Sequence, residues 1–315
     1  MIPQGRALAP AKRPYQDLWR DGGLVAAGSR DCRGRYDLVA ATLPNDPFTV
    51  LDVGAYTGYF SIRITEEFEA TATAVDDFAG LAGVTSDRVT VIRKRLGPRG
   101  LDALPRHDVV LTLSVLHHMR DWQAALRALR ACRSHLVIEV CHPDEKWMRA
   151  AASRHEVAAQ YKAVSSLPGA RLLGTSPRLG RDGVSYLRPM FLVPGTVRTL
   201  TGQAFTGSGS CSRNMPRYDR GLGAKLGYEP FPGSLNLRLP APHQLGRPCL
   251  NWVGMKRRDR QFWRAWVEEL PCHAHVPGRR NHGPDVLELV APVCLRERLR
   301  LKDGDLVTFD VEVGP

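Results

Sequence analysis

The sequence lacks the features of three classes of protein. Its seven cysteines are odd in number and widely spaced, with no Cys-x-x-Cys pair, which excludes a disulfide framework and a zinc ribbon and favours a reducing compartment. Cys272, His273 and His275 lack a fourth ligand at finger spacing, so we expect solvent-exposed side chains there rather than a metal site. No window approaches the ~18 apolar residues of a membrane span, and Met1 to Tyr15 has no apolar run of signal-peptide length. We therefore expect a cytoplasmic protein with no membrane partner.

Acidic residues are also few relative to basic ones. The 44 Lys and Arg against 32 Asp and Glu give a net charge of +12, which suits polyanions from nucleic acid to a nucleoside triphosphate. The basic residues are scattered and are not interleaved with aromatic residues as in a single-strand-binding groove. We therefore expect small-molecule substrates rather than nucleic acid, and the sequence indicates no oligomeric state.

The length predicts two domains. A chain of 315 residues with 43% hydrophobic content exceeds the usual size of one domain. The composition changes after "MFLVPG", where a stretch rich in Gly, Ser, Thr and Arg begins. We place the boundary there and expect domains at 1–194 and 195–315.

The first half contains a strand, a glycine turn and a helix. In "FTVLDVGAYTGYFSIRITEEF" we expect a buried strand over Phe48–Val53, a turn from Gly54 to Gly58 and a helix over Tyr59–Phe68. Helices are also expected over Tyr15–Trp19 and Tyr36–Leu43. Glycines in such a turn let a ligand lie against the backbone, and the following helix presents free N–H groups.

Acidic residues flank this turn. Asp52 stands ahead of it, as a ligand-binding group or as a simple turn carboxylate. The next predicted strand, Ala70–Val75, ends at Asp76, about twenty residues on, where an acid in an open α/β sheet accepts hydrogen bonds from ribose hydroxyls. This acid predicts a nucleoside ligand.

Two further strands bring polar residues to the same sheet edge. "HDVVLTLSVLHHM" places Ser114, His117 and His118 after a strand, and "SHLVIEVCHP" ends a strand at Glu139. Adjacent histidines point in different directions, so at most one can face the site, as a candidate general base. Glu139 is a candidate substrate contact, or alternatively a solvated strand end.

These motifs resemble the class I S-adenosylmethionine-dependent methyltransferases over about Pro44 to Val193. "LDVGAYTGYFS" is similar to their glycine motif, and "SVLHHM" to the segment near the transferred methyl group. The resemblance implies an α/β Rossmann-like fold that binds S-adenosylmethionine through Asp52, Gly54, Gly58, Asp76 and Ser114. It does not indicate the methyl acceptor. Methyl transfer depends mainly on aligning nucleophile, methyl and sulfur.

The second half has three separate motifs, "FTGSGSCSRN", "GYEPFPGSLNLRL" and "HGPDVLELVAPVCLRERLRLKDGDLVTFDVEV". Gly207 and Gly209 can form a turn whose N–H groups face a phosphate. Ser234 and Asn236 alternate to one face of a strand, so both oxygens can bind one hard cation such as Mg²⁺. Asp303-Gly304 predicts a turn between apolar strands.

In this order the motifs resemble the archaeal CTP-dependent riboflavin kinases, a small β-barrel family, over about Gly202 to Val313. "PGSLNLRL" is similar to the family's magnesium segment, with Ser234 in place of Thr and Asn236 retained. The resemblance implies that Glu288 contacts the flavin and that the cytidine nucleotide is lined by Val293, Cys294, Leu295 and Arg296.

The chain departs from this family at two places. Gly207 to Ser212 lacks an acid, a glycine and a basic residue of the family's glycine loop, with Arg213 as a candidate replacement for the lost charge. Arg280 stands where the family has a flavin-contacting Thr. Nucleotide binding is therefore better supported than riboflavin as the acceptor.

Together these features predict a bifunctional enzyme. It would combine methyl transfer to a small molecule with Mg²⁺-assisted, CTP-dependent phosphorylation of riboflavin to FMN. One alternative is a methyltransferase whose barrel only binds a cytidine nucleotide or flavin. A second is an RNA methyltransferase with a basic accessory barrel.

Overall fold

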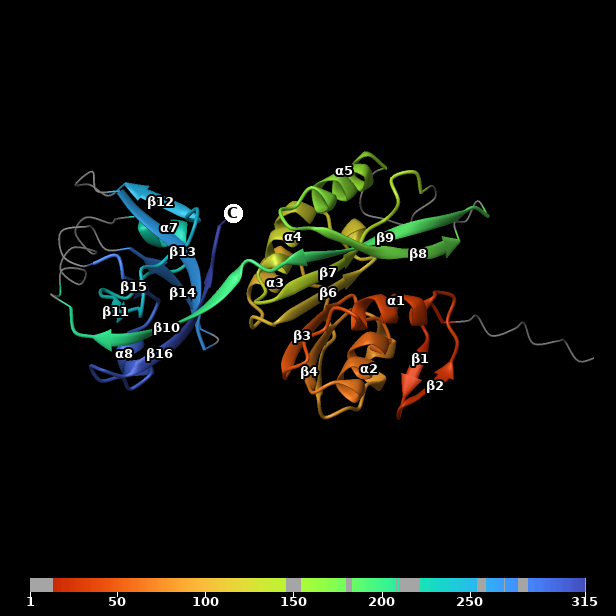
Figure 1. The fold of residues 1–315 in the computed structure, drawn as a ribbon, viewed down its shortest axis with the longest axis horizontal. Helices are drawn as coiled ribbons and strands as arrows, with labels where there is room; N and C mark the ends of the chain where they lie inside the picture. The colour runs from red at the N-terminus through yellow and green to blue at the C-terminus, as the bar shows by residue number, and fades with distance from the viewer. Residues whose placement is uncertain are drawn as a thin grey trace, which may run out of the picture. The chain divides into compact units, whose positions relative to one another are not determined.

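The chain folds into two compact units, Met1–Gly195 and Thr196–Pro315, in the computed structural model (Figure 1). The structure describes residues 14–145, 154–179, 183–207, 209, 221–253, 259–268, 270–276 and 283–314. Of the residues singled out in the sequence, Ser210 to Arg213 and Arg280 lie outside these ranges.

The first unit is built on a seven-stranded sheet whose central strands are buried on both faces. Every residue of Val109–Leu113 and of His135–Glu139 is buried. This is typical of parallel strands that are covered by helices on both faces of the sheet. Of the last two strands in the sheet, β9 runs antiparallel to the others and pairs antiparallel with β7 and β8, so β8 has the direction of the remaining strands. The sheet order is β5 (Val89–Ile92), β4 (Ala70–Val75), β3 (Phe48–Val53), β6 (Val109–Leu113), β7 (His135–Glu139), β9 (Ser185–Pro194) and β8 (Arg171–Leu179).

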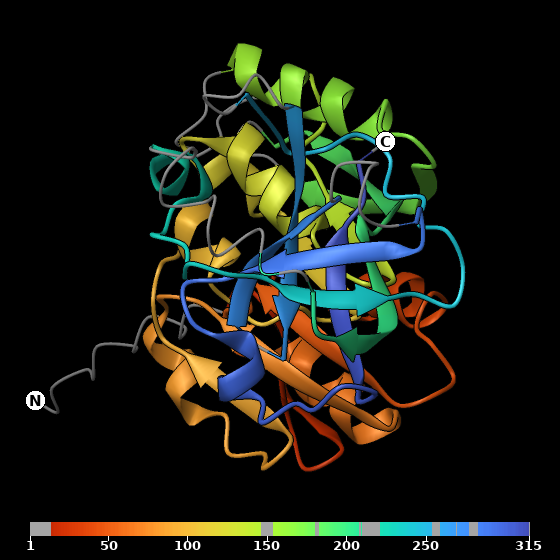
Figure 2. The same cartoon turned by 90° about the vertical axis from the view of Figure 1, so that its left-hand side faces the viewer.

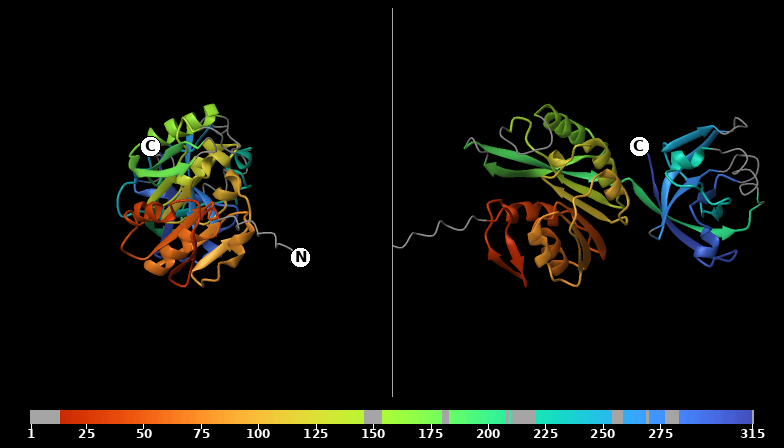
Figure 3. Two further views of the ribbon diagram at one scale, coloured as in Figure 1. Left: turned by 90° about the vertical axis from the view of Figure 1, so that its right-hand side faces the viewer. Right: turned by 180° about the vertical axis from the view of Figure 1, so that it is seen from behind.

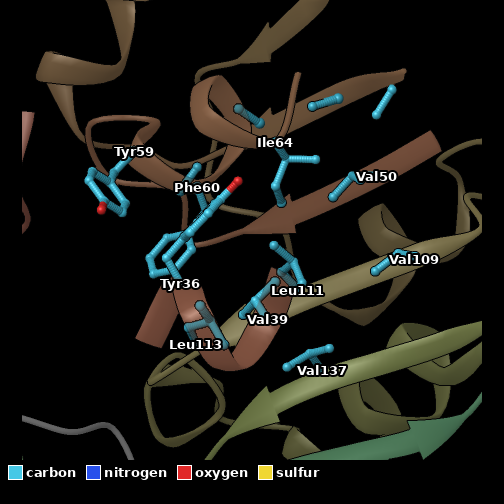
Figure 4. Close-up of a cluster of buried hydrophobic side chains, with 14 of the residues drawn as sticks. Tyr36, Val39, Val50, Tyr59, Phe60, Ile64, Val109, Leu111, Leu113 and Val137 are labelled. Atoms are coloured by element: carbon cyan, nitrogen blue, oxygen red, sulfur yellow. The ribbon is translucent and has the colours of Figure 1, made fainter. Parts of the chain in front are cut away.

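Helices cover the two faces of this sheet (Figures 1 and 3). Successive residues of β3 alternate between two apolar clusters, with Val50 in one and Leu51 in the other. Figure 4 shows the first cluster, in which Tyr36, Phe60 and Ile64 pack onto the sheet. One face carries α1 (Cys32–Ala40) and α2 (Tyr59–Glu67), and the other carries α3 (Pro98–Asp102), α4 (Trp122–Arg130) and α5 (Arg154–Ser165).

The amino-terminal segment departs from the sequence prediction. The helix expected over Tyr15–Trp19 is wrong, because Leu18–Arg20 forms strand β1 and pairs with β2 (Gly23–Ala26). Asp21 and Gly22 join the strands with φ values of 49° and 71°, as a two-residue hairpin turn requires. Helix α1 begins earlier than expected, at Cys32, because the Asp31 carboxylate accepts a hydrogen bond from the Gly34 N–H at 2.9 Å.

The second unit is a closed antiparallel barrel (Figure 2). Six strands pair in a ring, which is closed by pairing of β13 with β16, and β12 adds to the outside of β13. The strands are β10 (Val197–Phe205), β11 (Leu235–Arg238), β12 (Leu250–Val253), β13 (Asp259–Val267), β14 (Leu270–His275), β15 (Val286–Val290) and β16 (Leu306–Glu312), with short helices α7 (Leu222–Leu226) and α8 (Leu295–Arg298). The predicted fold class, an α/β domain followed by a mostly-β barrel, is confirmed.

Successive side chains of a barrel strand point alternately into the apolar core and outward. Leu235 and Leu237 point into the barrel core, so Asn236 between them points outward. Asn236 lies opposite Glu288 on β15, and Glu288 lies opposite His275 on β14. A polar row therefore crosses three neighbouring strands on the outer face.

The expectation that Cys272, His273 and His275 are solvent-exposed is wrong. They are 2%, 9% and 5% exposed because β14 is paired on both sides and its outward residues are covered. Among the described residues no group of three or more His, Cys, Asp and Glu side chains is arranged to hold a metal ion. The described helices also include none with the length and hydropathy to cross a membrane.

Candidate functional sites

The first unit has a cavity of about 850 Å³ at the carboxyl ends of its parallel strands. Gly54 follows β3, Asp76 follows β4 and Ser114 follows β6, and all three line this cavity. Ligands of open α/β sheets bind at this edge, and the volume is in the usual range for ligand sites. The cavity can hold a nucleoside-sized ligand together with a second molecule.

The glycine turn gives the ligand access to the backbone. Gly54 has φ of +83°, and a Cβ atom there would overlap the Val115 side chain. Gly58 has φ of +80° and is the N-cap of α2, so it ends the turn and starts the helix. Gly54 lines the cavity, whereas Gly58 is not among the described lining residues.

Asp76 is held rigidly at the end of β4. Its two oxygens accept hydrogen bonds from the backbone N–H groups of Tyr56, at 2.9 Å, and Phe78, at 2.8 Å. A carboxylate oxygen has a second lone pair, so Asp76 can still accept from hydroxyl groups in the cavity.

Asp52 lies beneath the turn and is not among the described residues that line the cavity. It is 2% exposed and accepts a hydrogen bond at 2.8 Å from Ser61 of α2. Burial raises the pKa of its carboxyl to about 6. In this position it ties β3 to α2.

Glu139, expected to contact substrate, is fully buried in a network of ion pairs. Arg30 and Arg35 each contact its carboxylate at 3.0 Å, and the hydroxyls of Ser114 and Ser176 also donate to it. Burial alone would raise the pKa of Glu139, but Arg35 and Arg30 lower it to about 2. Protein groups thus occupy the Glu139 oxygens, and the residue is not among the described lining of the cavity.

The same network fixes Ser114 at the cavity wall. Ser114 has φ of 64°, a conformation uncommon for a residue with a side chain. Its hydroxyl donates to Glu139 and accepts from the Arg188 guanidinium at 2.8 Å. Arg188 is paired in turn with Glu145. Ser114 is therefore oriented by protein partners before any ligand binds.

The rings of His117 and His118 lie 4.1 Å apart, and the two residues differ in their access to the cavity. His118 lines the cavity, while His117 is 4% exposed and is not among its described lining residues. Desolvation and Arg188 lower the pKa of His118, and desolvation and His118 lower the pKa of His117. A neutral His118 imidazole can accept a proton in the cavity at neutral pH.

The barrel has its own cavity, of about 280 Å³, on the outer face where β11 and β15 meet. The three polar residues Ser234, Asn236 and Glu288 line it. Ser234 donates a hydrogen bond to the Glu288 carboxylate at 2.8 Å. The Asn236 side chain is 9% exposed, and no hydrogen bond links its amide to another described residue.

Gly207 shapes this cavity around Asn236. A Cβ atom at Gly207 would lie 2.6 Å from Asn236 Nδ2, closer than side-chain contacts allow. Gly209, with φ of +67°, also lines the cavity. The glycine loop thus brings bare backbone against the Asn236 amide at the cavity wall.

The opposite wall is the start of α8. Val293, Cys294, Leu295 and Arg296 all line the cavity. The Arg296 guanidinium contacts Asp303 at 2.8 Å, and Asp303 also accepts from Thr206 at 3.0 Å. Asp303 therefore connects the turn after α8 to the glycine loop, and Arg296 brings positive charge to the cavity.

Comparison with known proteins agrees with both halves of the chain. The family model CTP-dep_RFKase, described as a domain of unknown function DUF120, matches residues 205–311, and a model described as a methyltransferase domain matches residues 26–173. A riboflavin kinase of Pyrobaculum calidifontis is 31% identical over 172 residues, covering 48% of this chain and 81% of the relative. The chain belongs to the riboflavin kinase family. It joins that family's domain to a methyltransferase domain.

Other riboflavin kinases are matched over less of their length. The relative from Halobacterium salinarum is 36% identical over 40% of this chain, and the relative from Methanoregula boonei is 32% identical over 42%. The chain spans 61% and 65% of these two relatives.

The solved structures similar to this chain include an S-adenosylmethionine-dependent methyltransferase from Listeria monocytogenes and another from Mesorhizobium loti. The first is 17% identical with a TM-score of 0.36, covering 51% of this chain and 96% of that one. The second is 16% identical with a TM-score of 0.30, covering 50% of this chain and 64% of that one. At these scores the solved structures add no support beyond the methyltransferase model.

Several lining residues carry no local sequence signal. Tyr15 and Gln16 lie about forty residues before the glycine motif yet line the methyltransferase-domain cavity. Phe205 and Phe231 form apolar walls of the kinase-domain cavity. Phe205 could have been found, because it is the first residue of the motif "FTGSGSCSRN".

Proposed function

We propose that the riboflavin kinase domain of this chain phosphorylates riboflavin to FMN with CTP and Mg²⁺. The supporting observation is Asn236, a nearly buried amide without a partner among the described residues, beside Ser234 and Glu288 in one cavity. The Asn236 amide atoms are not fully buried, so they are accessible to a ligand in the cavity. The grouping therefore favours a ligand site over packing.

The oxygen atoms of Ser234 and Asn236 fit a hard cation. Mg²⁺ prefers oxygen ligands and binds through few protein groups when phosphates supply the rest. When bound, Mg²⁺ would supply neutralisation of the phosphate charge. The chain's own residues would do the positioning: the backbone at Gly207 and Gly209 faces the phosphates, and the walls at Val293 to Arg296 hold the nucleotide.

Glu288 would fix the second substrate. Its carboxylate already accepts one hydrogen bond, from Ser234, and keeps further acceptor capacity toward the cavity. A flavin hydroxyl or ring N–H can donate to it. The flavin, which accepts the phosphate, and the nucleotide, which donates it, would then bind in the same cavity.

Nucleotide binding should protect Cys294 from alkylation. Cys294 lines the cavity, so bound CTP would cover its thiol. At CTP about ten-fold above its Kd, mass action leaves about one site in eleven free, and the rate of iodoacetamide labelling should fall about ten-fold. Peptide mass spectrometry would measure labelling at Cys294, with exposed Cys249 as the internal reference. Equal labelling of Cys294 with and without CTP would contradict the assignment of this cavity.

We further propose that the methyltransferase domain transfers a methyl group from S-adenosylmethionine to a small molecule. The donor would lie along the strand ends, with its ribose on Asp76 and its sulfonium near Ser114. S-adenosylmethionine supplies an activated methyl group, so the protein has mainly to align the acceptor. His118, in the wall of the cavity, could remove a proton from an acceptor that carries one.

Replacing Asp76 by Ala should weaken binding of S-adenosylhomocysteine by about 10-fold or more. A hydrogen bond to a charged group contributes about 1.5–3 kcal/mol, and the same substitution frees the Tyr56 and Phe78 N–H groups. Calorimetric titration would measure the Kd. Asp87→Ala, at an exposed position, serves as the control and should bind as the unmodified chain does. The ribose assignment would be wrong if Asp76→Ala also bound with unchanged affinity.

A further inference from the structure

The methyltransferase-domain cavity contains a polar group for which the fold provides no partner. Gln16 is 3% exposed and lines the cavity, and its side-chain oxygen is buried without a hydrogen bond. A buried amide oxygen without a hydrogen-bond partner destabilises the folded chain. Such a group in a cavity wall suggests that a ligand supplies the missing donor.

The position of Gln16 is fixed by backbone contacts on both sides. The Tyr15 carbonyl accepts from the Arg30 N–H at 3.1 Å, and the Asp17 carboxylate accepts from the Gly28 N–H at 2.6 Å. A Cβ atom at Gly28 would overlap the Gln16 backbone, so the two segments are in close contact. Gln16 is thus held in the wall by its neighbours rather than by its own side chain.

This segment lies over the glycine turn. The Thr57 hydroxyl donates to the Asp17 carbonyl at 3.2 Å, and the rings of Tyr15 and Tyr56 are 5.7 Å apart in an edge-to-face arrangement. The turn follows β3, whereas Asp76 follows β4, the next strand toward one edge of the sheet. A ligand with its ribose on Asp76 and its base toward β5 would have its other end beneath Tyr15 and Gln16.

At that end of S-adenosylmethionine is an amino-acid group with a positively charged ammonium. An ammonium has three donors and needs oxygen acceptors. Glu139, at the end of β7, is already bound by Arg30 and Arg35. The Gln16 oxygen is a buried acceptor in the wall with no protein donor.

We propose that Gln16 binds the ammonium of the amino-acid portion of the methyl donor. This assignment rests on the proposed methyltransferase function and adds a donor-binding residue outside the glycine motif. The carbonyl oxygen of Gln16 accepts a hydrogen bond from the ammonium. Gln16 therefore distinguishes ligands that carry the amino-acid group from nucleosides that lack it.

Calorimetric titration of the full chain with two ligands tests this assignment. S-adenosylhomocysteine carries the amino-acid group, and 5′-methylthioadenosine lacks it. Gln16→Leu should weaken S-adenosylhomocysteine binding by about 10-fold, because a hydrogen bond to a charged group is lost. The same variant should bind 5′-methylthioadenosine within about two-fold of the unmodified chain. Gln16→Glu keeps an acceptor oxygen and should retain S-adenosylhomocysteine binding.

The controls separate the possible failures. Gln123→Leu, at an exposed position on α4, should change neither affinity. If Gln16→Leu weakened the binding of both ligands equally, the side chain would only support the cavity wall. If the affinity for both ligands were unchanged, the side chain would not contact the methyl donor. Either result overturns the assignment. If the unmodified chain binds neither ligand, the methyltransferase function itself is wrong, and the assignment fails with it.

Discussion

Asn236→Ala is expected to lower the rate of FMN formation by about 100-fold or more. Changes to residues that only support a metal ligand already cost about 10- to 100-fold, and Asn236 is proposed as a direct ligand. Its amide is not bonded to other described residues, so its loss should leave the barrel folded. The rate would be measured by mass detection of FMN with riboflavin, CTP and Mg²⁺.

A matched variant shows whether this loss is specific. Asn251 lies exposed on β12, outside the ring of six strands, and Asn251→Ala should keep full activity. Raising the Mg²⁺ concentration should restore part of the rate of Asn236→Ala, because a site with weakened affinity becomes occupied at a higher Mg²⁺ concentration. If Asn236→Ala kept nearly unchanged activity, Asn236 would not be a ligand of the metal ion.

Glu139→Ala is expected to destabilise the methyltransferase domain by about 3–5 kcal/mol. Removing one partner of a buried ion pair leaves the other charges uncompensated, and here both Arg30 and Arg35 lose their carboxylate. Urea unfolding followed by circular dichroism would measure the change. Glu69→Ala, at an exposed position, should change stability by less than about 0.5 kcal/mol.

The same carboxylate predicts a dependence on pH. Arginine neighbours hold the pKa of Glu139 at about 2 against an ordinary value of 4.5, despite burial. Its stabilising contribution is therefore complete above about pH 4.5 and is lost as the pH falls toward 2. Glu139→Gln should lose less stability than the unmodified chain over this acid range. Parallel acid-unfolding curves for the two chains would contradict the ion network.

The sequence predicted elements whose signals are local. Strands β3 and β4 have the predicted bounds, because short apolar runs end at a glycine turn and at an acid. The segment Tyr15–Trp19 was misassigned as a helix although Asp21-Gly22, a hairpin turn signal, followed it. The turn signal at Asp21-Gly22 therefore agrees with the structure, in which it connects β1 to β2.

The sites were predictable only where residues follow a strand at the ligand edge. Gly54, Asp76 and Ser114 line the cavity for this reason. The same rule gave Glu139 as a substrate contact, but Arg30 and Arg35, about a hundred residues earlier, surround it instead. No local pattern reveals such partners, nor does one bring Gln16 to the cavity.

The barrel is proposed to act as a CTP-dependent riboflavin kinase. The most direct measurement is to incubate the full chain with riboflavin, Mg²⁺ and either CTP or ATP and to detect FMN by mass. FMN with CTP and far less with ATP is the predicted result. Absence of FMN, with Cys294 still protected by CTP, would contradict the claim and leave a nucleotide-binding module.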